Sequence, residues 1–594
     1  MNTSKEQPTT FANAARARLG PVGMFCARIT SALLIALALA LVVAACGGGS
    51  SDNNGSSGSG GSTSGGSSSG TSGGGREGGT ITVAVGTAPD FLDPQLGYTS
   101  QSEDSTWVVY TGLLTYRHAA GAAGGQLIPG LATSLPSVTD GGRTYTFTLR
   151  RGLVFSNGRP VRASDFAYSI ERMIRLNWGG KAFVTNYVVG ASAFDRGRTR
   201  SISGITTDDA SRRITIRLVE AYGAFANVLA VPAAGIVPTG TAMRNLSADP
   251  PPGVGPYMIT SSIPNRSWTL RRNPRFAGLH IPEIPLGHVD TLQFNINSNT
   301  TSEAQSVFDN EADVFDAGDT IPPSLLSQIN SQARDRFRKV STPSTFYFFL
   351  NSTKPPFNNQ RAREAVNYAI DRNAMVRLAS GFLSTECFFL PSGVIGHPTD
   401  TCPYGDKNAP RPDLARAKQL VQEAGLAGTP VTVWGEQRSP RRQYVDYYTS
   451  VLNSIGFRAT ERIVSDAVYF ATIGNARTDP QTGFADWVAD FPNPSDFYLL
   501  MDARSIQPTN NENFSRVNDP HIQSQLRVLN AVPATQLQSR ASDWEALDTY
   551  SAQKAYQLVY GEELLPQFYS NRIDFQSAIF HPVYFNDFTS LQLK

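Results

Sequence analysis

Apolar and polar residues alternate along several short stretches in the first half of the chain. The pattern is clear in TITVAVG at residues 80–86, YTFTL at 145–149, RRITIRL at 212–218 and TLQFNIN at 291–297. Alternation with a period of two puts successive side chains on opposite faces of a β-strand, so we expect strands at these positions. Asn157–Gly158 is a strong signal for a hairpin turn.

Helical periodicity appears between and after these strands. Phe166, Ile170, Met173 and Ile174 recur at the spacing of one helix face. After about residue 345 the chain alternates between helical and strand patterns. The apolar positions of two further predicted helices are Ala362, Ala365, Val366, Ala369 and Ile370, then Leu414, Ala417, Leu420, Val421 and Ala424. Gly425 is placed to end the second of these helices.

The segment from residue 431 to residue 464 predicts a βαβ unit. A short strand at 431–434 leads to apolar positions at helical spacing (Tyr444, Tyr448, Val451, Leu452 and Ile455), and a second strand follows at 457–464. Such a unit implies parallel strands. With the strands of the first half, it indicates an α/β protein with two α/β regions.

Composition restricts the class of function. The chain has 594 residues, 40% of them hydrophobic, which is enough for two or more domains with substantial cores. It carries 51 Lys and Arg residues against 49 Asp and Glu residues. This balance gives no electrostatic reason to expect a nucleic-acid partner, so none is predicted.

The N-terminus has the features of a secretory signal. Arg16, Arg18 and Arg28 precede an uncharged apolar run, ITSALLIALALALVVAA, at residues 29–45. The run ends in VAAC, which looks like a bacterial lipobox, so Cys46 is the predicted lipidation site. We expect residues 1–45 to be a lipoprotein signal peptide, with Met24 as an alternative start of translation. An uncleaved membrane anchor is the other interpretation.

Residues 46–78 are dominated by Gly and Ser after Cys46. Such a stretch buries little apolar area and is predicted to be a flexible tether. It includes GSSSG at residues 66–70, which fits the esterase pattern GxSxG, but no strand or helix pattern flanks it and we regard it as a chance match. An anchor followed by a tether predicts a globular body held just outside the membrane.

Cys387 and Cys402 are the only cysteines after the predicted lipidation site. They enclose a loop rich in Pro and Gly, and in an exported protein they are expected to form a disulfide. His397 lies in the same loop. A metal site needs more ligands than the loop supplies, so no metal and no cofactor is expected.

Enzyme signatures are missing from the sequence. There is no Walker A motif, HExxH, paired CxxC or helix-opening GxGxxG, and the six histidines are scattered. No nucleophile stands beside a recognisable base. We therefore predict a protein that is not an enzyme.

Six segments together resemble one family. They are DGGRTYTFTLRRGLVFSNGRPVRASDFAYSIERM, GVGPYMI, LRRNPRFAG, FYFFLNSTKPPFNNQRAREAVNYAIDR, RPDLARAKQLVQEAG and WVADFPNPSDFYL. In this order they look like the peptide/nickel class, family 5, of extracellular solute-binding proteins of ATP-binding-cassette importers. The resemblance covers residues 79–594. Within GVGPY, Gly253 and Gly255 predict a turn that other residues adopt poorly.

The resemblance implies a periplasmic-binding-protein-like α/β fold of two lobes that close on a ligand like a hinge. Lobe one would comprise residues 79–295 plus 569–594, and lobe two residues 296–568. A lipid-anchored, extracytoplasmic monomer would capture a solute and deliver it to a membrane permease driven by cytoplasmic ATPases.

The resemblance also proposes a ligand site in the stretch FADWVADFPNP, residues 484–494. Peptide-binding relatives carry W-x-A-D followed by an aromatic residue and prolines, and the aspartate holds the ligand's α-ammonium group. Trp487 and Asp490 match that motif, so Asp490 is the predicted ligand-binding carboxylate and Trp487 a wall of the cleft. Asp486 has no counterpart in the motif and is expected to be a surface acid. Phe491 and Asn493 depart from the commoner Tyr and Asp.

The preferred ligand is an oligopeptide or dipeptide. The main alternative is an oligosaccharide or metal chelate, for which the charge of Asp490 would not be needed. An alternative of another class is an exported hydrolase, which would need a reactive group that the sequence does not show. No segment is assigned to the ligand's far end.

Overall fold

The computed structural model describes residues 76–318, 320–399, 401–406 and 411–594. The chain divides into two units, residues 1–70 and 71–594, and every described residue belongs to the second unit. The predicted signal peptide, Cys46 and the tether as far as residue 75 lie outside the described residues.

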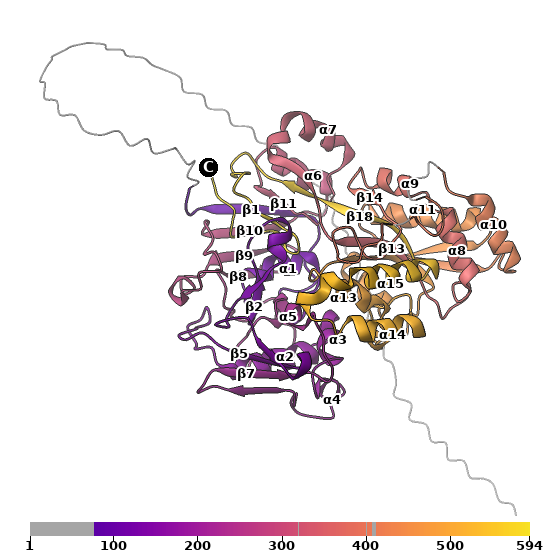
Figure 1. The fold of residues 1–594 in the computed structure, drawn as a ribbon. Coiled ribbons are helices and arrows are strands. Elements are labelled where there is room, and N and C mark those ends of the chain that lie inside the picture. The colour runs from indigo at the N-terminus through magenta and orange to yellow at the C-terminus, as the bar shows by residue number, and fades with distance from the viewer. Residues whose placement is uncertain (1–75, 319, 400, 407–410) are drawn as a thin grey trace, which may run out of the picture. The chain divides into compact units, whose positions relative to one another are not determined.

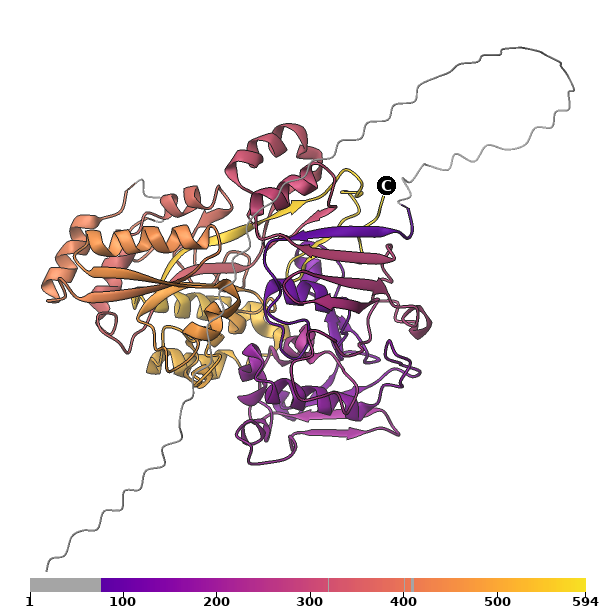
Figure 2. The same ribbon diagram turned by 180° about the vertical axis from the view of Figure 1, so that it is seen from behind.

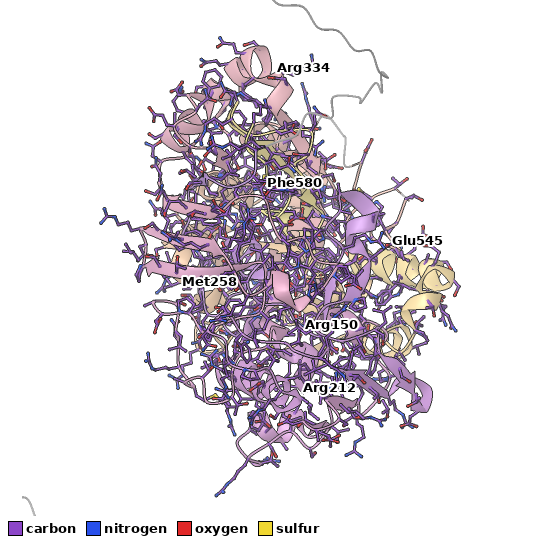
Figure 3. All side chains as sticks on the ribbon, turned by 90° about the vertical axis from the view of Figure 1, so that its left-hand side faces the viewer. Arg150, Arg212, Met258, Arg334, Glu545 and Phe580 are labelled. Atoms are coloured by element: carbon purple, nitrogen blue, oxygen red, sulfur yellow. A yellow bond between two sulfur atoms is a disulfide. The ribbon has the colours of Figure 1, made fainter. Side chains whose placement is uncertain are left out.

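Two sheets are built by the first half of the described chain, and a long one by the second half (Figure 1). The five-stranded sheet has the order β11 (Val314–Phe315), β1 (Thr80–Val85), β10 (Thr291–Ile296), β9 (Ser267–Arg272) and β8 (Tyr257–Ile263). The four-stranded sheet has the order β4 (Ser137–Thr139), β5 (Thr144–Thr148), β7 (Arg213–Arg217) and β6 (Ile205–Asp208). Strand β8 is an edge strand, and Met258 marks it in Figure 3.

The seven-stranded sheet runs β12 (Phe337–Ser341), β18 (Gln557–Phe568), β13 (Ser344–Leu350), β17 (Thr482–Val488), β15 (Pro430–Glu436) and β16 (Arg458–Val464), with β14 (Leu383–Thr385) paired to β18. Short pairs are formed by β2 (Leu114–Tyr116) with β3 (Leu127–Pro129), and by β19 (Phe580–His581) with β20 (Phe585–Asn586). In Figures 1 and 2 the orange helices α8–α11 cover one face of the seven-stranded sheet, and the yellow helices α13–α15 lie on the other.

The helices of the first half are α1 (Ser100–Trp107), α2 (Ala163–Arg175), α3 (Ala182–Thr185), α4 (Ala191–Asp195), α5 (Phe225–Val228), α6 (Thr300–Phe308) and α7 (Pro323–Gln332). Those of the second half are α8 (Gln360–Ala369), α9 (Arg372–Leu378), α10 (Leu414–Glu423), α11 (Arg441–Ser454), α12 (Asp466–Ile473), α13 (Pro494–Phe497), α14 (Pro520–Leu529) and α15 (Ala541–Gln553). None of the helices in the described ranges is long and apolar enough to cross a bilayer.

The elements that the periodic patterns predict are present in the structure. Strands β1, β5, β7 and β10 and helices α2, α8 and α10 form where the sequence predicts them. Strands β15 and β16 pair in parallel on either side of α11, so the βαβ prediction is confirmed. The apolar positions of these helices are buried, except that Leu414, in the first turn of α10, is exposed and Ala424, at its C-terminal end, is half-buried.

Gly253 and Gly255 are required for a different reason from the one the sequence suggested. Neither residue has a positive φ. A Cβ atom at Gly253 would lie 2.4 Å from the carbonyl oxygen of Val109, and one at Gly255 would lie 2.5 Å from that of Val108. The two glycines are therefore needed because this segment packs directly against the backbone that follows α1.

The C-terminal residues return to the beginning of the described chain. Arg76 forms a β-bridge with Leu593, so the C-terminus lies beside the start of β1 (Figure 1). Strand β11 pairs with β1 although it lies between residues 296 and 568. The lobe boundaries given above remain a prediction.

Candidate functional site

Asp490 lies just after the end of β17, where a buried strand turns toward a short helix. Its side chain is 7% exposed. The phenol of Tyr98 donates a hydrogen bond to Oδ2 of Asp490, with an O···O distance of 2.8 Å. Tyr98 is 392 residues earlier in the chain. The site is therefore assembled from two segments that the sequence separates widely.

Tyr98 is itself held firmly in place. Its backbone N–H donates to the carboxylate of Asp90, at 3.1 Å from Oδ2. The indole of Trp178 donates to the neighbouring carbonyl of Gly97 at 3.1 Å, and its ring packs edge-on against the Tyr98 ring at 5.0 Å. These contacts orient the phenol toward Asp490 before any ligand arrives.

Asp496 orients the strand end that carries Asp490 and Trp487. Its Oδ2 accepts the backbone N–H of Asp490 at 2.9 Å and the indole N–H of Trp487 at 3.3 Å. The Trp487 ring also packs edge-on against Tyr98 at 6.0 Å. Asp496 is part of the family motif, but neither its role here nor that of Tyr98 was predicted from the sequence.

Burial raises the pKa of Asp490 to about 7, and the hydrogen bond from Tyr98 opposes that rise. In the described part of the chain, no arginine, lysine or histidine forms an ion pair with this carboxylate. A buried carboxylate without a cation is costly, because desolvation is not repaid by an opposite charge. Asp490 is thus ready to accept either a proton or a cationic group.

Three further acids extend the negative charge around Asp490. Burial first, and then the charge of Asp490, raises the pKa of Glu103, of Asp496 and of Glu512, the last to about 8. Oε1 of Glu103 and Oδ1 of Asp496 are buried without a hydrogen-bond partner. This concentration of acids favours a ligand that brings positive charge.

Asp486 is not the surface acid that the sequence suggested. It lies on β17, and its carboxylate is 2.6 Å from a guanidinium nitrogen of Arg441. A second nitrogen of Arg441 is 2.6 Å from Oε1 of Glu436 on the adjacent strand β15. All three side chains are largely buried. Asp486 is therefore a structural member of an ion-pair network within the sheet.

The two departures from the family motif have simple places in the structure. Phe491 is buried and packs edge-on against Phe183, with 5.2 Å between the ring centroids. Asn493 caps α13, since its side-chain oxygen accepts the N–H of Ser495 at 3.0 Å. Asparagine caps a helix about as well as aspartate does, so this function is kept.

Cys387 and Cys402 are joined by a disulfide in the structure. Both side chains are buried, and they pack with Phe388 in a small apolar cluster of their own. The bond closes the loop that contains His397 and fixes both of its ends. The remaining predicted site residue, Cys46, lies outside the described residues.

The sequence model for the middle region of bacterial extracellular solute-binding proteins, family 5, matches residues 126–507. The chain belongs to this family. Family 5 proteins are substrate-binding components of importers rather than enzymes, and they work outside the cytoplasm with permease and ATPase subunits. The resemblance drawn from the six sequence segments is thereby confirmed.

Curated relatives of this family 5 chain include glutathione-binding proteins. The glutathione-binding protein GsiB of Salmonella choleraesuis (strain SC-B67) is 26% identical over 398 residues, which is 64% of this chain and 68% of the relative. Protein XP55 of Streptomyces lividans is 28% identical over 363 residues, or 59% of this chain and 58% of XP55.

Solved structures show the same fold. The clavulanic acid biosynthesis oligopeptide binding protein 2 superposes with a TM-score of 0.77 at 23% identity, covering 87% of this chain and 96% of that one. The murein tripeptide binding protein MppA of Escherichia coli gives 0.74 at 18% identity, covering 87% and 98%. OppA of Haemophilus influenzae, in complex with RPPGFSPFR, gives 0.73 at 17% identity, covering 87% and 99%.

Proposed function

We propose that this family 5 protein is a lipid-anchored receptor that binds peptides for an importer and holds the peptide's α-ammonium group on Asp490. The observation that carries the proposal is the buried Asp490 carboxylate, which Tyr98 orients and which no cation of the described chain neutralises. A protonated amine supplies the missing charge and forms a charge-assisted hydrogen bond. Several relatives are named for binding glutathione, murein tripeptide or oligopeptides, which favours the same ligand class.

The surrounding acids strengthen the preference for a cationic end. Glu103, Asp496 and Glu512 each interact electrostatically with Asp490, and their pKa values are raised, so a positive charge at this point would favour the ionised form of each acid. A neutral sugar would gain little from them and would leave Asp490 desolvated without a partner. An oligosaccharide is therefore the weaker alternative, and a metal chelate would have to present a positive face here.

Peptide capture can be tested directly by mass spectrometry. The full-length protein is incubated with a library of short peptides, separated from free peptide and analysed. We expect intact peptides to remain with the wild-type protein and few to remain with the Asp490→Ala variant. Cleaved products would instead favour the exported hydrolase. Equal recovery with both proteins would contradict the role of Asp490.

The lipid anchor gives a separate prediction. Since VAAC precedes the Gly/Ser stretch, Cys46→Ser should abolish metabolic labelling with palmitate and leave the protein either released or unprocessed. The matched control is Cys26→Ser, which alters the other N-terminal cysteine and should leave labelling unchanged. Palmitate incorporation that persists in the Cys46→Ser variant would overturn the assignment.

A further inference from the structure

Three metal-ligating side chains from separate parts of the chain meet beside the disulfide loop. Glu386 precedes Cys387, His397 lies within the loop, and Glu562 is on β18. One ligand atom from each of the three lies within 4.8 Å of the other two. The ring nitrogen Nε2 of His397 is 3.9 Å from Oε2 of Glu386. This cluster is separate from the Asp490 site.

The imidazole of His397 is oriented as a metal ligand would be. Its Nδ1 lies 2.7 Å from the carbonyl oxygen of Leu390, so Nδ1 carries the proton and donates it there. In the neutral ring, Nε2 is then unprotonated, and its lone pair is on the side of Glu386. A hydrogen bond from the second ring nitrogen to a carbonyl is the usual arrangement behind a histidine that binds a metal.

Both carboxylates are held by hydrogen bonds from the loop. Oε1 of Glu386 accepts the backbone N–H of Cys387 at 2.7 Å and that of Phe388 at 3.2 Å. The carboxylate of Glu562 accepts both the backbone N–H and the hydroxyl of Ser392. The disulfide fixes the ends of the loop. The three ligands are therefore preorganised and would lose little conformational freedom on binding a metal ion.

The balance of charge around the cluster favours a cation. Glu386 is 3% exposed and Glu562 is 4% exposed. Asp548, fully buried, interacts electrostatically with His397 and accepts the N–H of Leu390 at 3.0 Å. Arg372 interacts electrostatically with Glu386. Glu386, Glu562 and Asp548 thus bring three buried carboxylates to this loop, and buried carboxylates are normally paired or bound to a metal.

We propose that Glu386, His397 and Glu562 bind a divalent transition-metal ion. One imidazole nitrogen and two carboxylate oxygens suit Zn²⁺, with water completing a tetrahedron. Mg²⁺ and Ca²⁺ prefer sites made of oxygen alone. The ion would fasten the disulfide loop to β18. No metal was expected from the sequence because the loop alone offers too few ligands, whereas Glu562 comes from a strand 165 residues beyond His397.

The test uses the full-length protein without a histidine tag, with Zn²⁺ alone as the probe. Equilibrium dialysis should find one ion in the wild-type protein that is lost in His397→Ala and in Glu562→Gln, with affinity reduced about 100-fold. Ser392→Ala removes only the hydroxyl that orients Glu562 and should weaken binding roughly tenfold. The control is His521→Ala, because His521 packs against Tyr550, at 4.3 Å between ring centroids. The N-terminal segment is the same in every variant and contributes equally.

Thermal melting provides a second readout. Zn²⁺ should raise the melting midpoint of the wild-type protein and of His521→Ala, and leave that of His397→Ala unchanged, because a metal that binds only the folded state stabilises it. Zinc binding of equal affinity in wild type and His397→Ala would overturn the proposal. So would the absence of zinc binding in the wild-type protein, since a proton on His397 would then be the compensating charge.

Discussion

Replacing Asp490 with alanine is expected to lower peptide affinity by roughly two to three decades or more. The proposed ligand ammonium would be left unpaired in a desolvated site, a loss of about 3–5 kcal/mol by analogy with broken buried ion pairs. Each 1.4 kcal/mol is worth tenfold in affinity. Isothermal titration calorimetry with a defined peptide measures the change directly. The fold should persist, because the ligand-free protein gains no ion pair from Asp490.

Acetylating the N-terminus of the same peptide removes the charge from the other partner. It should weaken binding to the wild-type protein by a comparable amount and have little further effect on Asp490→Ala. The four affinities form a double-mutant cycle that isolates the energy of the contact. The matched control is Asp486→Ala, which removes the acid paired with Arg441 and should retain the preference for the free N-terminus. Equal affinity of the wild-type protein for both peptides would contradict the proposed ammonium site.

The elements of the fold that the sequence predicts well are those with a local signal. Helix α2 and the β15–α11–β16 unit each show their periodicity over a few turns or residues, because one face packs into the core. The glycines of GVGPY show the limit of this reasoning. Their importance was visible, but its cause lies in the backbone of Val108 and Val109, about 145 residues earlier. No local sequence pattern indicates that two distant backbone segments come this close together.

The residues of the candidate site also differ in whether the sequence around them carries a local signal. Asp490 and Trp487 were found because they belong to a short motif that resembles a family. Tyr98 has no such signal, since only the fold brings it to Asp490. The error over Asp486 has a related cause: its alternation along β17 gives no sign of Arg441, which arrives from α11. The order of the strands and the packing of α11 against them bring Arg441 to Asp486, and neither was predicted.

The buried carboxylate of Asp490 should lower the free energy of unfolding of the ligand-free protein, by an amount that depends on pH. Its pKa rises from 3.8 to about 7 in the folded state because the carboxylate is buried. Between these values the folded state keeps a proton that the unfolded state has lost, so the free energy of unfolding falls as the pH rises through this range, and the loss is complete above pH 7. One pKa unit is worth about 1.4 kcal/mol, so the loss in free energy of unfolding has an upper bound of roughly 4 kcal/mol.

Asp490→Asn removes this dependence while its side-chain oxygen still accepts the hydroxyl of Tyr98. The melting midpoints of wild type and variant should nearly coincide at about pH 4, and the variant should melt at a higher temperature as the pH rises, with a constant difference above pH 7. Asp486→Asn is the matched control. It breaks the pair with Arg441 and should lower the midpoint instead. Midpoints of wild type and Asp490→Asn that agree from pH 4 to pH 8 would show that Asp490 is not strained by burial, and the reason for expecting a cationic ligand there would be lost.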